Sequence, residues 1–246
     1  PMFCLTAVVP LLGVLLALQV SMGIGNVLLS LPLFLAVAHN TGAALLLGSM
    51  MGTLRTAPHR GLALFATSWV EMFRNVPLLV QMFLWFFVVP ELLPRDLSLW
   101  VKQDMPAKEF ITAVVCLGLF TSARVAEQVR AGIQSLPRGQ SMAGLAIGLT
   151  LPQTYRYVIL PMAFRIIIPP LTSEFMNIFK NSSVAFAIGV LELTFQARQM
   201  QEDSEQGIET YLAVTVLYFI CAFIANRGMA FIEKRSRVPG FIATAK

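Results

Sequence analysis

The sequence predicts an integral membrane protein built entirely of α-helices, and its composition and the length of its apolar stretches indicate this. Of the 246 residues, 57% are hydrophobic and only 13% are charged, whereas a soluble domain averages about 25% charged residues. Several apolar stretches approach the roughly 20 residues that a helix needs to cross a bilayer. Helices are expected because lipid offers no partners to backbone polar groups, so a spanning segment must pair them internally.

The first 54 residues contain no acidic or basic side chain, so charge cannot orient this region. Residues 2–22 are apolar enough either to span the membrane or to lie in its interface, and the sequence leaves both open. Residues 27–54 predict one firm span that ends near Leu54. Gly48 and Gly52 form a G-x-x-x-G step in this span, which permits another helix to approach closely.

Four further apolar stretches follow, at about residues 61–89, 110–131, 166–193 and 211–232. The first is expected to form one long helix. It is longer than a minimal span, so its beginning is expected at the inner membrane surface. Pro169 and Pro170 predict that the helix of the third stretch begins after a kink or at Pro170, because proline removes a helical hydrogen bond.

The loops between these stretches alternate in charge. The first loop is basic, the next is mixed, the loop 132–165 carries arginines only, the following loop is acidic and the C-terminal tail is basic. Because cytosolic loops are enriched in lysine and arginine, the loop 132–165 and the C-terminus are predicted to be cytosolic. The pattern gives five spans, or six if residues 2–22 also cross. It also explains the net charge of +5 without nucleic acid.

Two short helices are predicted in the arginine-only loop. The first covers about residues 140–147 and is ended by Gly148, since glycine readily adopts the left-handed conformation of a C-cap. The second begins at Thr150, where Thr150 and Gln153 fit a capping box. The apolar side chains presented here are Leu145, Ile147, Leu149 and Leu151. They either bind a protein partner or fold back on the chain's own helices.

The same loop carries a motif known from a family. Met142-Ala143-Gly144 is followed by Gly148 and then by Val158-Ile159-Leu160-Pro161. This resembles the EAA-type loop in the membrane permease subunits of bacterial ABC importers of polar amino acids, and most of all the glutamate/aspartate permeases. The signature is imperfect, because Met142 stands in place of glutamate and Gly144 in place of alanine. The resemblance covers about residues 48–240.

The resemblance implies the transmembrane domain of a type I ABC importer, with a core of five transmembrane helices and a cytosolic coupling helix that docks in a cleft of an ATPase subunit. The expected regions are an apolar N-terminal region at 1–47, a permease core at 48–240 that contains the coupling loop 132–165, and a tail at 241–246. The residues assigned to coupling are Met142, Ala143, Gly144, Gly148, Leu149, Thr150, Pro152, Leu160 and Pro161. The residues expected to anchor the loop are Arg124, Glu127, Arg130 and Gly139. Arg124 and Glu127, and Glu127 and Arg130, are three residues apart, so ion pairs between them are expected to fix the root of the loop.

Polar side chains inside apolar stretches are candidates for a translocation path, since a buried charge costs about 2.5–3.5 kcal/mol on insertion scales. These candidates are Arg74, Asn75, Gln81, Lys180, Asn181, Ser182, Ser183 and Glu192. Glu71 and Arg74 can pair on one helix face, and Pro77 leaves the carbonyl of Phe73 without its helical donor. This first group is either a wall of the path or, as the favoured reading, a structural pair at the cytosolic end of the helix.

The second group, Lys180 to Ser183, is expected in the middle of the stretch 166–193. It suits either a carboxylate-bearing solute or an inter-helix hydrogen-bond cluster, and Glu174 is no obvious partner for Lys180 because it lies on another helix face. Glu192 is either an outer-gate residue or an interfacial one, and the second reading is favoured.

Motifs for other functions are missing. The sequence has no G-x-x-x-x-G-K-[ST] phosphate loop and no H-E-x-x-H zinc motif, and its three cysteines lack metal or disulfide spacing. We therefore expect no enzyme, no metal and no cofactor bound by this chain, with ATP and Mg²⁺ used by a partner ATPase. An ATPase-independent channel or secondary transporter for a small polar solute is the alternative, which the cytosolic loop disfavours.

The resemblance implies a bacterial inner-membrane, multi-pass protein with several partners. These are a second permease subunit, identical or a similar paralogue, two ATPase subunits, a periplasmic binding protein that delivers the amino acid, and lipid, with no nucleic acid. Arg74 and Lys180 could attract a dicarboxylic amino acid such as glutamate or aspartate, although another polar amino acid fits as well.

Overall fold

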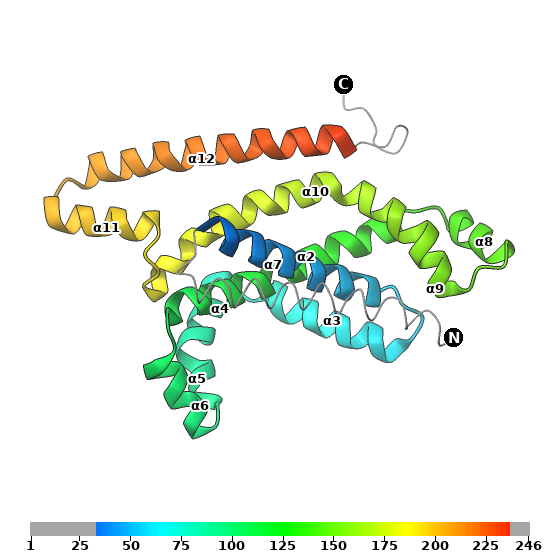
Figure 1. Cartoon of the computed structure of the whole chain (residues 1–246), viewed down its shortest axis with the longest axis horizontal. Helices are drawn as coiled ribbons and strands as arrows, with labels where there is room; N and C mark the ends of the chain where they lie inside the picture. The colour runs from blue at the N-terminus through cyan, green and yellow to red at the C-terminus, as the bar shows by residue number, and fades with distance from the viewer. Residues whose placement is uncertain (1–32, 237–246) are drawn as a thin grey trace. The chain divides into compact units, whose positions relative to one another are not determined.

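The computed structural model describes residues 33–236, and every element in this range is helical (Figure 1). The expectations about residues 2–22 and the tail 241–246 lie outside the described residues. The α-helices are α2 (Leu33–Leu54), α3 (Arg60–Asn75), α4 (Leu78–Phe83), α5 (Val89–Leu92), α6 (Arg95–Leu99), α7 (Lys108–Gln134), α8 (Arg138–Ala146), α9 (Leu151–Thr154), α10 (Leu160–Asn181), α11 (Leu193–Ser204) and α12 (Gly207–Ser236). Between them lie the π-helical turns Leu84–Val88, Trp100–Asp104 and Tyr155–Ile159 and the 3₁₀-helix Ser182–Ile188.

Within the described range, three helical segments are long and apolar enough to cross a membrane. They are Lys108–Gln134, Leu151–Ile188 and Gly207–Phe231, and the bent pair Arg60–Asn75 and Leu78–Leu92 makes a fourth if it counts as one span. Helix α2 contains no charged residue and ends at Leu54, the predicted residue. The core of five spans stays a prediction, with α2 as the fifth candidate.

The predicted continuous helix over residues 61–89 is wrong. Helix α3 ends at Asn75, and the axis turns by 102° before α4 begins at Leu78. Pro77 explains the break, because it has no N–H to donate and disfavours the α conformation in the residue before it. Gln81 compensates for the break: its side-chain Nε2 donates to the carbonyl of Phe73 at 2.7 Å and to that of Val76 at 2.8 Å.

The prediction that a helix begins after a kink at Pro169 and Pro170, or at Pro170 itself, is also wrong. Pro169 and Pro170 lie inside α10, which begins at Leu160. Proline's fixed φ is compatible with a helix, so only the N–H donors are lost, and membrane helices tolerate this loss where other groups compensate. The helical path in fact starts earlier still, at Leu151, through α9 and the turn Tyr155–Ile159.

The described residues form two compact units, each with its own apolar core. Residues 33–71 and 122–171 make the first, and residues 72–121 and 172–235 make the second. The buried core of the first unit consists of Val125, Val129, Ile133, Leu136, Ile159, Ala163 and Ile167. The buried core of the second unit consists of Leu78, Met82, Ala113, Cys116, Leu117, Ala185 and Ile188.

Helix α2 packs closely on α7 inside the first unit. A Cβ atom built on Gly48 would lie 2.6 Å from the carbonyl oxygen of Ser122, and one on Gly52 would lie 2.5 Å from that of Ala126. Only glycine fits at such distances, so the G-x-x-x-G step is confirmed as a close-contact surface. This packing brings the end of α2 beside the C-terminal half of α7.

Candidate functional site

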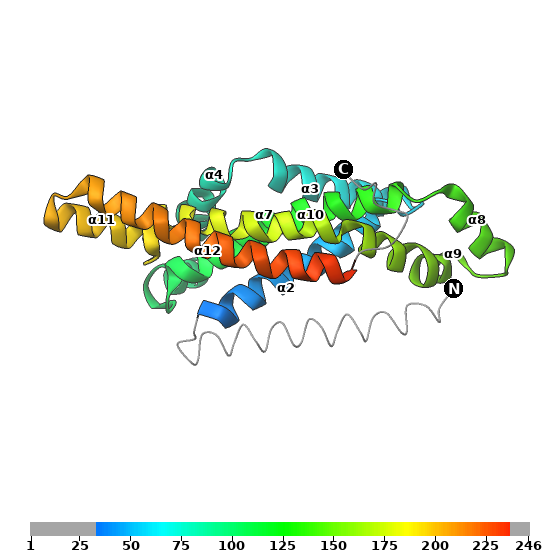
Figure 2. The ribbon, with the colours of Figure 1, turned by 90° about the horizontal axis from the view of Figure 1, so that it is seen from above.

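The loop after α7 contains the two short helices that the sequence predicts, α8 and α9, and in both views they lie next to each other beside the start of α10 (Figure 1; Figure 2). Gly148 separates them with a φ of +87°, the left-handed conformation expected of it. The backbone N–H of Thr150 donates to the side-chain Oε1 of Gln153 at 2.8 Å, which confirms the capping box at the start of α9.

The loop presents an exposed apolar surface. Met142 is 68% exposed, Leu145 is 48% exposed and Ile147 is 78% exposed. The alternative that the loop's apolar residues only fold back on the chain is therefore wrong for Leu145 and Ile147, whereas Leu149 and Leu151 are half-buried. An exposed apolar surface of this kind is typical of a binding site for another protein. We call Met142, Leu145 and Ile147 the apolar knob.

Gly144 explains how α8 and α9 stay together. It is buried, and a Cβ atom on it would lie 2.7 Å from Cγ2 of Thr154, which is itself fully buried. A larger residue would force the two helices apart. The glycine that departs from the family's alanine therefore has a packing reason, since Thr154 occupies the space that the alanine methyl group would need.

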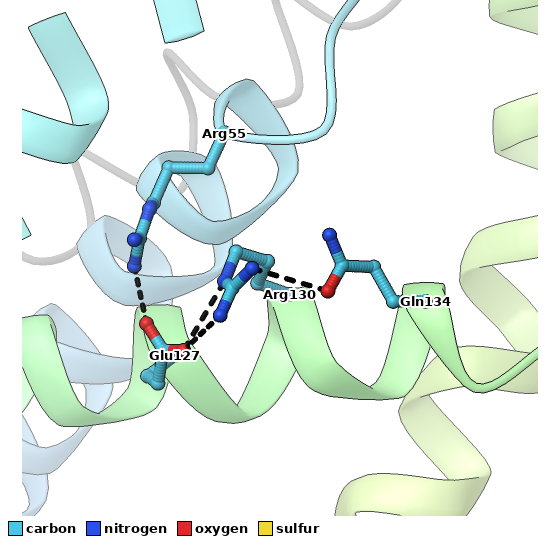
Figure 3. A network of polar contacts seen from close by, with 4 residues as sticks. All are labelled: Arg55, Glu127, Arg130 and Gln134. Atoms are coloured by element: carbon cyan, nitrogen blue, oxygen red, sulfur yellow. Dashed lines mark hydrogen bonds and ion pairs between the residues drawn. The ribbon is translucent and has the colours of Figure 1, made fainter. Parts of the chain in front are cut away.

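A network of charged side chains holds the root of the loop (Figure 3). Glu127 on α7 forms ion pairs with Arg55, just after α2, and with Arg130, one turn further along α7. Arg130 also donates to Oε1 of Gln134 at 3.1 Å. The predicted pair of Glu127 and Arg130 is confirmed.

Sequence reasoning missed Arg55, which is 72 positions from Glu127. No local spacing relates the two, and the useful signal is the glycine step that lays α2 on α7. The predicted pairing of Arg124 with Glu127 stays a prediction. Gly139 is exposed, and a Cβ atom on it would have no neighbour within 4 Å, so packing gives no reason for its assignment as an anchor.

A second connection leads from the loop to α2. The hydroxyl of Tyr155 donates to the backbone carbonyl of Thr56 at 3.1 Å. Both residues line an open pocket of about 580 Å³, which the ends of α2 and α7, the start of α8 and the turn Tyr155–Ile159 surround. Of the other residues assigned to coupling, Ala143, Thr150, Pro152 and Pro161 are exposed, and Leu160 packs against the core of the first unit.

The candidates for a translocation path differ in how far their side chains are buried. Gln81 is buried and serves the backbone at the Pro77 break, whereas Arg74 and Asn75 lie exposed at the end of α3. Lys180 is exposed and lies in the last turn of α10, and Asn181 beside it is half-buried.

The remaining path candidates make local structural contacts. The hydroxyl of Ser182 donates to the carbonyl of Phe179, and that of Ser183 to the carbonyl of Lys180, both at 2.8 Å. Glu192 caps α11 by accepting from the backbone N–H of Phe195 at 2.8 Å, and it accepts from the hydroxyl of Tyr218 at 2.9 Å. Both readings of Glu192, as an interfacial residue and as an outer gate, stay predictions. Among the described residues no group of three or more potential ligands could hold a metal ion.

Known proteins share much of this sequence. A family model described as binding-protein-dependent transport system inner membrane component matches residues 44–238. The chain belongs to this family. It is 49% identical over 199 residues to the glutamate/aspartate import permease protein GltJ of Escherichia coli K12, which covers 80% of this chain and 81% of that protein. It is 33% identical over 193 residues to GltK, the glutamate/aspartate import permease protein of E. coli O6:H1, covering 78% and 84%.

A solved structure agrees with this assignment. The crystal structure of an amino acid ABC transporter with histidines superposes with a TM-score of 0.67 at 28% identity, covering 89% of this chain and 96% of that one. The chain is thus an inner-membrane transport subunit with the type I ABC importer fold. The apolar knob lies in the loop that carries the family's signature, and the charged network joins the end of α7, at the start of this loop, to the end of α2.

Proposed function

We propose that this chain is the membrane permease subunit through which an ATP-driven importer moves glutamate, aspartate or another polar amino acid. The observation that carries the proposal is the apolar knob: 49% identity to a glutamate/aspartate import permease accompanies a loop whose large apolar side chains are exposed. A subunit that worked alone would have no use for this surface, whereas a transport subunit needs one to receive work from a motor.

The motor is a pair of ATPase subunits that bind ATP and Mg²⁺, because this sequence carries no phosphate-binding loop of its own. The assembly is completed by a second permease subunit, identical or similar to this one, and by a periplasmic binding protein that delivers the amino acid. The loop and the C-terminus face the cytosol, as the arginine-only loop 132–165 favours.

Transport follows from the geometry of the loop. The apolar knob docks in a cleft of the ATPase, and closure of the two ATPase subunits around ATP draws the two loops of the permease dimer together. Because each loop is rooted at the ends of apolar helices, its displacement tilts those helices and exposes the path to the other side of the membrane. The amino acid is thereby moved without any chemistry on this chain.

The path itself draws on the polar groups that the fold leaves exposed. Arg74 and Lys180 are exposed cations that suit the carboxylates of a dicarboxylic amino acid. The contacts made by Gln81, Ser182, Ser183 and Glu192 serve the backbone and a helix cap, so we assign these four residues to support of the path rather than to binding.

The test is an uptake assay with the complete transporter in vesicles, using the native binding protein and a panel of amino acids. We expect uptake that requires ATP, with glutamate and aspartate competing most strongly. Uptake of the same solute without the ATPase would overturn the proposal and favour a channel or a secondary transporter.

A further inference from the structure

We propose that the end of α2 belongs to the coupling apparatus, with Arg55 and Tyr155 as the positioning residues that make α2 and α7 follow the coupling loop. The proposal rests on the proposed function, because it assigns a route by which movement of the loop reaches the membrane helices. All of the residues involved lie in the first compact unit.

The first link is the Tyr155 hydroxyl. Tyr155 follows directly on α9 and opens the turn Tyr155–Ile159, so its ring is displaced whenever α9 is displaced. Its hydroxyl donates to the backbone carbonyl of Thr56 at 3.1 Å, and the hydroxyl of Thr56 lies 3.4 Å away. Because the acceptor is a backbone carbonyl, this hydrogen bond holds the main chain at Thr56 and does not depend on the rotamer of the Thr56 side chain.

The open space beside this hydrogen bond increases its importance for joining the loop to α2. The pocket of about 580 Å³ between α8 and the end of α2 is open, and both Tyr155 and Thr56 lie in its lining, so packed side chains do not fill the space beside their hydrogen bond. Where two elements meet across an open space, the few groups that bridge it determine how one follows the other. Tyr155 is such a bridge, with its ring packed against the core of the first unit on the other side.

The second link is the ion pair of Arg55 with Glu127. The two side chains are only 11% and 24% exposed, so their attraction is screened less than that of a surface pair, and removing one partner leaves a partly buried charge uncompensated. Glu127 is also held by Arg130 on its own helix. The end of α2 is thus fixed to a carboxylate that α7 keeps in place.

The third link is the packing of α2 on α7 through Gly48 and Gly52. Their backbones approach so closely that a single added Cβ atom would lie 2.5–2.6 Å from a carbonyl of α7. Two helices in such contact move together, because packed surfaces deform little. A displacement of α9 that pulls on Thr56 is therefore passed to α2 and to α7 as a pair.

The experiment compares two single-hydroxyl deletions in the complete transporter, with the ATPase and binding protein present. Tyr155→Phe removes the bond to Thr56 and keeps the ring. Tyr157→Phe is the matched control, since Tyr157 lies in the same turn and its side chain is 61% exposed. The measured quantity is the amount of amino acid transported per ATP hydrolysed, together with the thermal unfolding midpoint.

We expect Tyr155→Phe to lower transport per ATP about fivefold, the order of effect that one hydrogen bond supplies, with ATP hydrolysis unchanged and the unfolding midpoint lowered by about 2–4 °C at most. Tyr157→Phe is expected to match the unmodified protein. Arg55→Gln should likewise lower the ratio, and Arg55→Lys should restore most of it, because lysine keeps the charge that pairs with Glu127.

Two results would overturn the proposal. One is an equal transport ratio in Tyr155→Phe and Tyr157→Phe. The other is a parallel fall of uptake, ATP hydrolysis and unfolding midpoint, which is what a purely stabilising contact gives. If instead the unmodified protein showed no ATP-dependent uptake, the proposed function would fail, and this outcome is distinguishable because it does not involve the variants.

Discussion

At the scale of single residues, the backbone of Gly148 sets the angle between α8 and α9. Its φ of +87° costs an L residue with a branched Cβ roughly 1–2 kcal/mol, and a Cβ atom there would meet nothing within 4 Å. A side chain at this position is thus penalised through the backbone alone. The glycine therefore fixes how α8, which carries Met142 and Leu145, is set against α9.

This leads to a prediction with two variants of Gly148. Gly148→Val should uncouple ATP hydrolysis from uptake while membrane insertion continues, because valine resists the left-handed conformation. Gly148→Asn should retain most of the coupling, since asparagine tolerates that conformation. Uptake and ATP hydrolysis in the complete transporter check both. Transport in Gly148→Val equal to that of the unmodified protein would count against the coupling role.

Gly144 and Thr154 give a second prediction. Gly144→Ala should lower the stability of the chain by roughly 1–3 kcal/mol through overpacking against Thr154. In the double variant with Thr154→Ala, the space opened by the smaller residue should accommodate the new methyl group and recover part of the loss. Unfolding of the single and double variants measures the coupling energy. Simple addition of the two single effects would contradict the contact.

The charged network shows which contacts a sequence pattern can predict. The spacing of three between Glu127 and Arg130 is enough to predict their pairing, because such residues are neighbours on a helix. Arg55 joins the same carboxylate from another helix, and only the packing of α2 on α7 brings it there. Patterns within one helix are therefore predictable from sequence, whereas contacts between helices depend on how their surfaces meet.

At the scale of elements, prolines have opposite outcomes in two helices. Pro77 ends α3, and the polar side chain of Gln81 takes over two carbonyls at the break. Pro169 and Pro170 leave α10 continuous. The sequence predicts the wrong outcome in both cases, because proline weakens a helix locally and the surrounding structure decides whether the backbone bends. The start of α9 at Thr150 and the end of α2 at Leu54 depend on local signals and are predicted correctly.

The break at Pro77 yields a third prediction. Gln81→Leu should destabilise the chain by roughly 1–3 kcal/mol, because it leaves the carbonyls of Phe73 and Val76 without the donor that serves them. Gln196→Leu on α11 is the control, since Gln196 is exposed and should tolerate the change. Thermal unfolding and the amount of protein in the membrane report the effect. Equal values for the two variants would show that the bend does not need Gln81.

At the scale of the whole molecule, the apolar helices and the loop 132–165 are the two parts of the chain to which different roles are assigned. The apolar stretches provide the candidate spans, and their length and composition could be predicted because the bilayer constrains both, whereas their number of five stays a prediction. The coupling loop could be predicted because its motif resembles a family signature. The path could not be predicted equally well, since Ser182, Ser183 and Glu192 are bonded to the protein itself.

The central claim is that the apolar knob receives force from a separate ATPase. Photo-crosslinking tests this most directly, with a photoreactive amino acid in place of Ile147, the most exposed residue of the knob at 78%, and a control at the exposed Ser204. We predict that position 147 in the complete transporter captures the ATPase subunit and that position 204 does not. Capture of lipid alone, of this chain alone or of nothing from position 147 would contradict the account.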